Sequence, residues 1–218
     1  MRITLPSGTP AELARFGDDP RAGLVIAPDI FGLRPLFDDL CQRIALEQGY
    51  SVVAVEPFPG RDLGSDVEVR QDTVGQLDDA TVLRDLVEGA EATGCERVGL
   101  IGFCMGGMYA HKAAALGAFH RIVSFYGMIR VPARWNSPGQ GEPLDELTRP
   151  GASQVLAIIG ERDPYTPPAD VDALAAVPSV TVVRYDAEHG FVHDANRPSH
   201  RPDDAADAWR RCFAFLDG

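Results

Sequence analysis

Short, almost uninterrupted apolar runs recur along the chain, and they constrain its fold more than any other feature. Five of them have the length of a strand that is buried on both faces: residues 24–27, 52–55, 98–103, 122–125 and 155–159. A sixth run alternates more strongly and is expected nearer a sheet edge: residues 180–185. Continuous runs of Val, Ile and Leu are typical of parallel sheets that helices cover on both faces.

Between these runs, apolar residues follow a helical spacing. Leu36, Leu40 and Ile44 share one face of a helix, and the same period recurs over residues 82–90 and 209–216. Strands that alternate with helices predict an α/β fold, here a doubly wound, mostly parallel sheet with helices on both faces.

The remaining segments complete the expected layout. Two weaker runs, residues 2–5 and 12–16, are expected to form a leading antiparallel hairpin. Residues 127–151 hold four prolines and four glycines with little periodicity, and a loop this long is usually functional. We expect a single domain over residues 1–218, with the 127–151 segment as a lid or rim over a site.

Charge and composition exclude several classes of partner. The chain has 20 basic and 32 acidic residues, a net charge of −12, and no basic block. This argues against nucleic acid and against an anionic membrane surface as partners. Neither a signal-peptide core nor a membrane-spanning run is evident. We expect a soluble, cytoplasmic monomer or small homo-oligomer that acts on a small molecule.

The four cysteines, at positions 41, 95, 104 and 212, form no C-x-x-C pair. Reduced thiols are therefore expected, with no metal site and no cofactor. The helical spacing places Cys41 and Cys212 in the core. Cys104 differs, because it lies in the stretch GFCMGG between an apolar run and a helical pattern.

This strand–turn–helix context is that of a nucleophile elbow, G-x-S-x-G, with cysteine in place of serine. Glycines at positions 102 and 106 permit a sharp turn that presents Cys104 at its apex. The N-terminus of the following helix would stabilise a thiolate, and the Met105 N–H would be one oxyanion donor. The alternative is that Cys104 merely fills space in the core.

An acid and a histidine follow the elbow in the chain order of an α/β-hydrolase triad. Asp163 lies four residues beyond the run ending at Ile159, and His189 lies four residues beyond Tyr185. Both come just after strand ends, where doubly wound sheets place ligands. We therefore predict a triad of Cys104, Asp163 and His189. His193 is a rival base, and the rival acids are Asp170 and Asp186.

The loop after the first buried run, in the stretch LVIAPDIFGL, supplies two further candidates. In this fold that loop donates the second oxyanion N–H, for which Ile30 is the candidate. The neighbouring Asp29 either caps the loop or tunes the protonation of Cys104.

Together these segments resemble the dienelactone hydrolase family of the α/β-hydrolase superfamily. The matching stretches are PDIFGL (28–33), GFCMGG (102–107), GERDPYTP (160–167), EHGF (188–191) and RPDDAADAWRRCFAFL (201–216). The resemblance implies a cofactor-independent Cys-His-Asp hydrolase of small esters or lactones. It also implies a glutamate at the position of Asp29 that keeps the resting thiol neutral, so the aspartate is a departure.

Arginines bind a substrate carboxylate in the best-known members of that family, one of them at the position of His193. The substrate-binding candidates in this chain are therefore His193, Arg70, Arg162 and Arg197. The sequence thus predicts hydrolysis through an acyl-cysteine intermediate on Cys104. The alternative is a non-catalytic α/β-hydrolase domain that binds a small ligand or a protein, in which Cys104 has no special reactivity.

Overall fold

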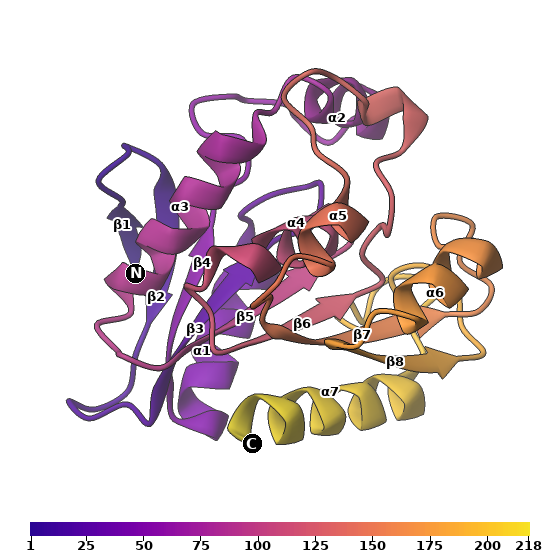
Figure 1. The fold of residues 1–218 in the computed structure, drawn as a ribbon. Helices are drawn as coiled ribbons and strands as arrows, with labels where there is room; N and C mark the ends of the chain where they lie inside the picture. The colour runs from indigo at the N-terminus through magenta and orange to yellow at the C-terminus, as the bar shows by residue number, and fades with distance from the viewer.

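One eight-stranded sheet organises the chain, and the computed structural model describes residues 1–218 (Figure 1). The strands lie in the order β1-β2-β4-β3-β5-β6-β7-β8. Their bounds are β1 (Arg2–Thr4), β2 (Pro10–Ala14), β3 (Ala22–Ala27), β4 (Tyr50–Val55), β5 (Val98–Phe103), β6 (Arg121–Phe125), β7 (Gln154–Gly160) and β8 (Val180–Tyr185). From β4 to β8 all neighbours are parallel, whereas β2 pairs antiparallel with β1 and β4. The predicted doubly wound sheet, its leading hairpin and its edge strand are confirmed.

Helices cover both faces of this sheet (Figure 1). They are α1 (Pro35–Gln48), α2 (Val67–Val74), α3 (Asp79–Ala92), α4 (Met105–Lys112), α5 (Pro143–Leu147), α6 (Pro168–Ala175) and α7 (Pro202–Asp217), with the 3-10 helices η1 (Ala113–Leu116) and η2 (Ala133–Trp135). One apolar cluster joins the sheet to α3 and α4, and a second joins its other face to α1 and α7. Cys41 and Cys212 are completely buried in the second cluster, as the helical spacing predicted.

The sequence sets the ends of several helices directly. Four helices begin at a proline, whose fixed φ and missing N–H suit the first helical position: α1, α5, α6 and α7. Asp78 caps α3 by accepting a hydrogen bond from the Thr81 N–H. Gly49 ends α1 in the left-handed conformation at φ 72°, which costs a glycine little.

The segment 127–151 holds more structure than its sequence suggested, because η2 and α5 lie within it. It packs against α2, a helix that the apolar spacing did not reveal (Figure 1). Trp135 is buried, and its indole N–H donates to the Gln71 side chain at 2.6 Å. Arg134 pairs with Glu68 at 2.7 Å and with Asp72 at 2.6 Å. Contacts between residues some sixty positions apart have no sequence period, so spacing alone could not find them. The role of this segment as a lid or rim stays a prediction.

A buried lysine fastens the same segment to the helices beneath it. The Lys112 side chain is 1% exposed, and its ammonium donates to Asp79 at 2.8 and 3.0 Å. It also donates to the side-chain amide oxygen of Gln140 at 2.6 Å. The Gln140 amide in turn donates to the Leu77 carbonyl and to the Tyr109 hydroxyl. These bonds tie α4, the start of α3 and the 127–151 segment into one unit.

We expect Lys112→Met to lower the free energy of unfolding by about 3 kcal/mol, because it leaves the Asp79 carboxylate without its buried partner. The measurement is equilibrium urea unfolding. The double variant Lys112→Met/Asp79→Asn should lose clearly less than the sum of the two single variants.

Arg130→Met is the matched control, because Arg130 pairs with Asp170 at 3.1 Å from a side chain that is 54% exposed. An exposed pair contributes at most about 1 kcal/mol. Equal losses for Lys112→Met and Arg130→Met would contradict the role given to Lys112.

Candidate active site

Cys104 forms a sharp turn between β5 and α4. Its φ and ψ are 56° and −117°, a conformation that L-residues rarely adopt. The Cys104 N–H donates to the Phe125 carbonyl at 3.0 Å. Such a backbone costs on the order of 1–3 kcal/mol and persists only where the surroundings hold it. The thiol therefore occupies the apex of a turn that the neighbouring strands keep in place.

The glycines around Cys104 are required by close backbone contacts. A Cβ on Gly102 would lie 2.1 Å from the Gly106 carbonyl oxygen, and one on Gly106 would lie 2.1 Å from the Ala27 carbonyl oxygen. A Cβ on Gly107 would lie 2.7 Å from the Cα of Gly127. Any side chain at these positions would push α4 away from β5, from the end of β3 or from the turn after β6. The glycine pattern around the cysteine thus has a packing cause.

Asp163 and His189 meet beyond the ends of β7 and β8. His189 Nδ1 lies 2.7 Å from Asp163 Oδ2, and the Asp163 side chain is fully buried. The other carboxylate oxygen accepts the Tyr165 N–H at 2.8 Å. The rings of Tyr165 and Tyr126 meet the imidazole edge-on, at centroid distances of 4.9 and 5.1 Å. These contacts fix the ring with Nδ1–H on Asp163, and its buried Nε2 has no hydrogen-bond partner.

The charge state of His189 depends on Cys104. Burial alone lowers the pKa of His189, but the charge of Cys104 and the hydrogen bond that the ring donates to Asp163 raise it to about 10. Cys104 and Asp163 are thus the two groups that raise the pKa of this imidazole. A thiolate beside an imidazolium is the arrangement that activates a cysteine nucleophile.

The two rival acids, Asp170 and Asp186, lie away from the histidines. Asp170 pairs with Arg130 near the start of α6, and Asp186 pairs with Arg162 from a side chain that is 71% exposed. Neither carboxylate makes a hydrogen bond with a histidine. Among the predicted acids, Asp163 is the one that the fold brings to His189.

The two predicted oxyanion donors have free N–H groups. Ile30, outside the helices and strands, donates its backbone hydrogen to no other backbone group, and Met105 is the first residue of α4, where the N–H has no partner within the helix. The loop that carries Ile30 is held from both sides. Arg70 donates to the Ile30 carbonyl at 3.0 Å, and the Glu56 carboxylate accepts the Leu33 N–H at 2.9 Å. Two N–H groups near a thiol are what stabilisation of an oxyanion requires.

Asp29 lies at the centre of a buried hydrogen-bond network beneath this loop. Its carboxylate accepts from the Phe31 N–H (3.0 Å), both Nη atoms of Arg34 (2.7 and 2.9 Å), His193 Nε2 (2.9 Å) and Arg197 Nη2 (3.4 Å). Burial raises the pKa of Asp29, but the bonds from His193 and Arg34 outweigh it and hold that pKa well below its usual range. The carboxylate makes no hydrogen bond with Cys104, so its predicted thiol-tuning role has no contact to support it.

The network continues through His193 to Tyr126. Burial lowers the pKa of His193, which favours a neutral ring that donates from Nε2 to Asp29. Its Nδ1 bonds the Tyr126 hydroxyl, and the Tyr126 backbone has a positive φ of 41°. With both nitrogens engaged and its side chain buried, His193 is in place to orient Tyr126, whose ring packs on His189.

Sequence reasoning missed Tyr126 and Arg34. Tyr126 directly follows β6, and the same position after a strand identified the other site residues, so a signal was present. Arg34 had none, because its bidentate bond to Asp29 depends on the fold of the loop.

The predicted substrate-binding arginines occupy three different settings. Arg197 joins the Asp29 network, together with His193. Arg70 holds the Ile30 loop and also donates to the Gly64 carbonyl at 2.6 and 2.8 Å. Arg162 lies at the surface, paired with Asp186. The structure thus brings two of the four candidates, His193 and Arg197, beside Asp29, and one, Arg70, to the Ile30 loop.

One known protein family matches this chain along most of its length. The model of the family described as "Dienelactone hydrolase family" matches residues 11–218. The chain belongs to the dienelactone hydrolase family. The predicted resemblance and the α/β-hydrolase superfamily are therefore confirmed.

Among its relatives is a protein of Synechocystis sp. named "Putative carboxymethylenebutenolidase", 31% identical over 86% of this chain and 82% of the relative. The carboxymethylenebutenolidase of Rhodococcus opacus is 27% identical over 97% of this chain and 88% of its own. A crystal structure from Klebsiella pneumoniae titled "Putative Dienelactone Hydrolase" superposes with a TM-score of 0.86 at 25% identity. It covers 100% of this chain and 97% of its own. None of the helices in this family member has the length and hydropathy needed to cross a membrane.

We expect Cys104→Ala to lower the pKa of His189, because it removes the charge that stabilises the imidazolium while burial continues to oppose it. NMR titration of the His189 ring protons measures this change. In the wild type the ring should stay protonated well above pH 7, and in the variant it should lose its proton at lower pH. Cys95→Ala, at a half-buried cysteine before β5, is the control and should leave the titration unchanged. Identical titration in all three proteins would contradict the Cys104–His189 interaction.

Proposed function

We propose that this member of the dienelactone hydrolase family is a cofactor-independent hydrolase of small carboxylic esters or lactones, acting through Cys104, His189 and Asp163. The observation that carries the proposal is geometric: Cys104 stands at the apex of the strained turn between β5 and α4, and the fully buried Asp163 carboxylate lies 2.7 Å from His189 Nδ1. The free N–H groups of Ile30 and Met105 add the expected oxyanion donors.

The first half of the reaction acylates the cysteine. The Cys104 thiolate attacks the carbonyl carbon, a C–S bond forms, and the carbonyl electron pair moves onto oxygen. The N–H groups of Ile30 and Met105 hold this oxyanion, an effect of about 3 kcal/mol per donor in comparable sites. The oxyanion collapses, the C–O bond to the alcohol breaks, and His189 Nε2 gives its proton to the leaving oxygen.

The second half releases the acid. His189 now takes a proton from water, and the resulting hydroxide attacks the acyl-thioester. Collapse of the second oxyanion expels the Cys104 thiolate beside the re-formed imidazolium. Throughout, Asp163 holds the Nδ1–H and stabilises the charged ring, and it keeps its own charge.

A cysteine nucleophile favours esters and lactones over amides. The thiolate is a good leaving group, so a tetrahedral intermediate with a poor amine leaving group returns to substrate. An alkoxide leaving group competes better once His189 protonates it. The relatives named carboxymethylenebutenolidase support a cyclic ester among the substrates.

We expect Cys104→Ala to abolish hydrolysis of activated esters and lactones, and Asp163→Asn to lower kcat by about 10³–10⁴, since the amide can no longer stabilise the imidazolium. Initial rates over a panel that includes dienelactone measure both effects. Asp170→Asn is the matched control and should retain the wild-type rate.

Two outcomes would count against the proposal. Hydrolysis by a folded Cys104→Ala variant at the wild-type rate would remove Cys104 from the mechanism. Absence of turnover by the wild type, with Cys104 alkylated no faster than the buried cysteines, would favour a non-catalytic binding domain.

A further inference from the structure

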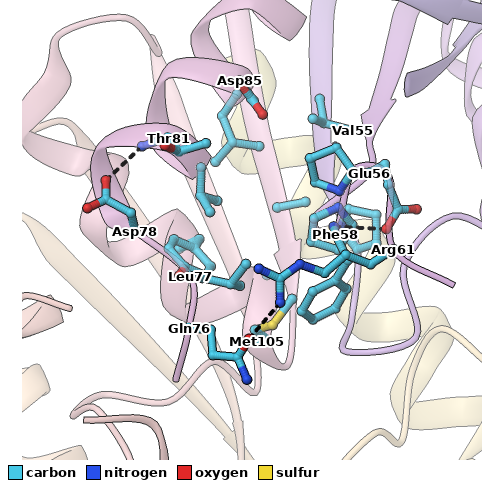
Figure 2. A pocket seen from close by; sticks show the side chains of 18 residues that line it. Val55, Glu56, Phe58, Arg61, Gln76, Leu77, Asp78, Thr81, Asp85 and Met105 are labelled. Carbon is cyan, nitrogen blue, oxygen red and sulfur yellow. Dashed lines mark hydrogen bonds between the residues drawn. The ribbon is translucent and has the colours of Figure 1, made fainter. Parts of the chain in front are cut away.

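A cavity of about 240 Å³ lies between α3, α4 (the helix that follows Cys104) and the segment that follows β4 (Figure 2). Its apolar wall comes from Phe58, Leu77, Val82, Leu86, Met105 and Tyr109. Neither Cys104 nor His189 lines it. Its floor includes Met105 and Gly106, the first residues of α4, and Ala27 and Pro28, which lead to the Ile30 loop. The cavity therefore borders both backbone segments that carry the predicted oxyanion donors.

The sheet order decides which part of an ester faces this cavity. β5, which leads to Cys104, lies between β3 and β4 on one side and β6, β7 and β8 on the other. His189 follows β8, and as the general acid it must face the leaving alcohol. The alcohol therefore lies toward β8, and the acyl group extends the other way, toward β4. The cavity lies on that acyl side.

The charged groups of the wall disfavour an anionic ligand. Glu56 and Asp78 have no ion-pair partner, and each accepts backbone N–H groups instead. Asp85 is paired with Arg84, which stands outside the lining. The lining contains a single guanidinium, that of Arg61. These carboxylates are bonded to groups around the cavity and point away from its centre, but with a single guanidinium among the lining residues their net charge is negative and disfavours a carboxylate on the ligand.

The same wall offers a neutral ligand both contact area and a polar anchor. Arg61 donates one N–H to the side-chain amide oxygen of Gln76 at 2.9 Å, and Figure 2 shows this pair beside Met105. The remaining donors of the guanidinium and the Gln76 amide can meet a carbonyl or ether oxygen. Mostly apolar walls with a few polar groups are typical of small-molecule sites.

We propose that this cavity is the acyl-binding subsite of the enzyme and that it selects substrates with an uncharged, apolar acyl group over acyl groups that carry a carboxylate. The inference rests on the proposed function, since it uses the same nucleophile and general acid. Each methylene that the cavity buries raises kcat/KM by up to about fourfold.

Val82→Phe tests the subsite by filling the cavity from α3. Val87→Phe makes the same change on the same helix, at a half-buried position outside the cavity, and is the matched control. The substrates are three 4-nitrophenyl esters with one leaving group: the acetate, the hexanoate and the hemiadipate, whose acyl chain matches the hexanoate in length but ends in a carboxylate.

We expect the wild type to prefer hexanoate over hemiadipate by at least about tenfold in kcat/KM. Val82→Phe should lower kcat/KM for the hexanoate about tenfold or more and leave the acetate within about twofold. Val87→Phe should behave as the wild type. Thr81→Phe narrows the cavity from an exposed position, so it should reproduce the selective loss even if Val82→Phe does not fold.

Preference for the hemiadipate would overturn the charge selection. Equal hexanoate rates for the wild type and both cavity variants, Val82→Phe and Thr81→Phe, would overturn the subsite. Either result leaves acetate hydrolysis by Cys104 intact, so it differs from failure of the proposed function, in which a folded Cys104→Ala variant hydrolyses all three esters.

Discussion

The strained backbone at Cys104 is the constraint on which the rest of the site depends. A residue at φ 56° and ψ −117° keeps this conformation because β5, β3 and β6 surround it closely. Gly106 allows α4 to touch the end of β3, and Gly107 allows it to touch the turn after β6. These contacts place the thiol at the carboxyl edge of the sheet, where the loops after β3, β7 and β8 converge.

A buried set of polar contacts supports the same edge from below. Asp29 accepts two bonds from Arg34 and one from His193, which links the loop of Ile30 to the loop after β8. The other ring nitrogen of His193 is hydrogen-bonded to the Tyr126 hydroxyl, and the Tyr126 ring packs against His189. The segments that carry His189 and Ile30, the proposed base and the proposed second oxyanion donor, are thereby held by one network. A buried carboxylate is stable there because charged and polar donors surround it.

Much of this architecture could be predicted from the sequence, because strands leave local apolar runs and the site residues follow a fixed order along the chain. Apolar runs identified every strand of the parallel sheet, and chain order after strand ends singled out the Asp163 and His189 pair, which the fold brings together. Contacts between distant side chains carry no such signal. The packing of Trp135 on α2 and the bond of Arg34 to Asp29 depend on the folded loops. The cavity beside α4 is likewise a property of packing.

Detection of the acyl-enzyme tests the central claim most directly. The wild-type protein, mixed briefly with an activated ester and quenched in acid, is digested and analysed by mass spectrometry. We expect the peptide that contains Cys104 to carry the acyl mass, and this mass to disappear as the ester is consumed. Continued hydrolysis with the acyl group on another residue, or with none on Cys104 when deacylation is slowed by a hindered ester, would contradict it.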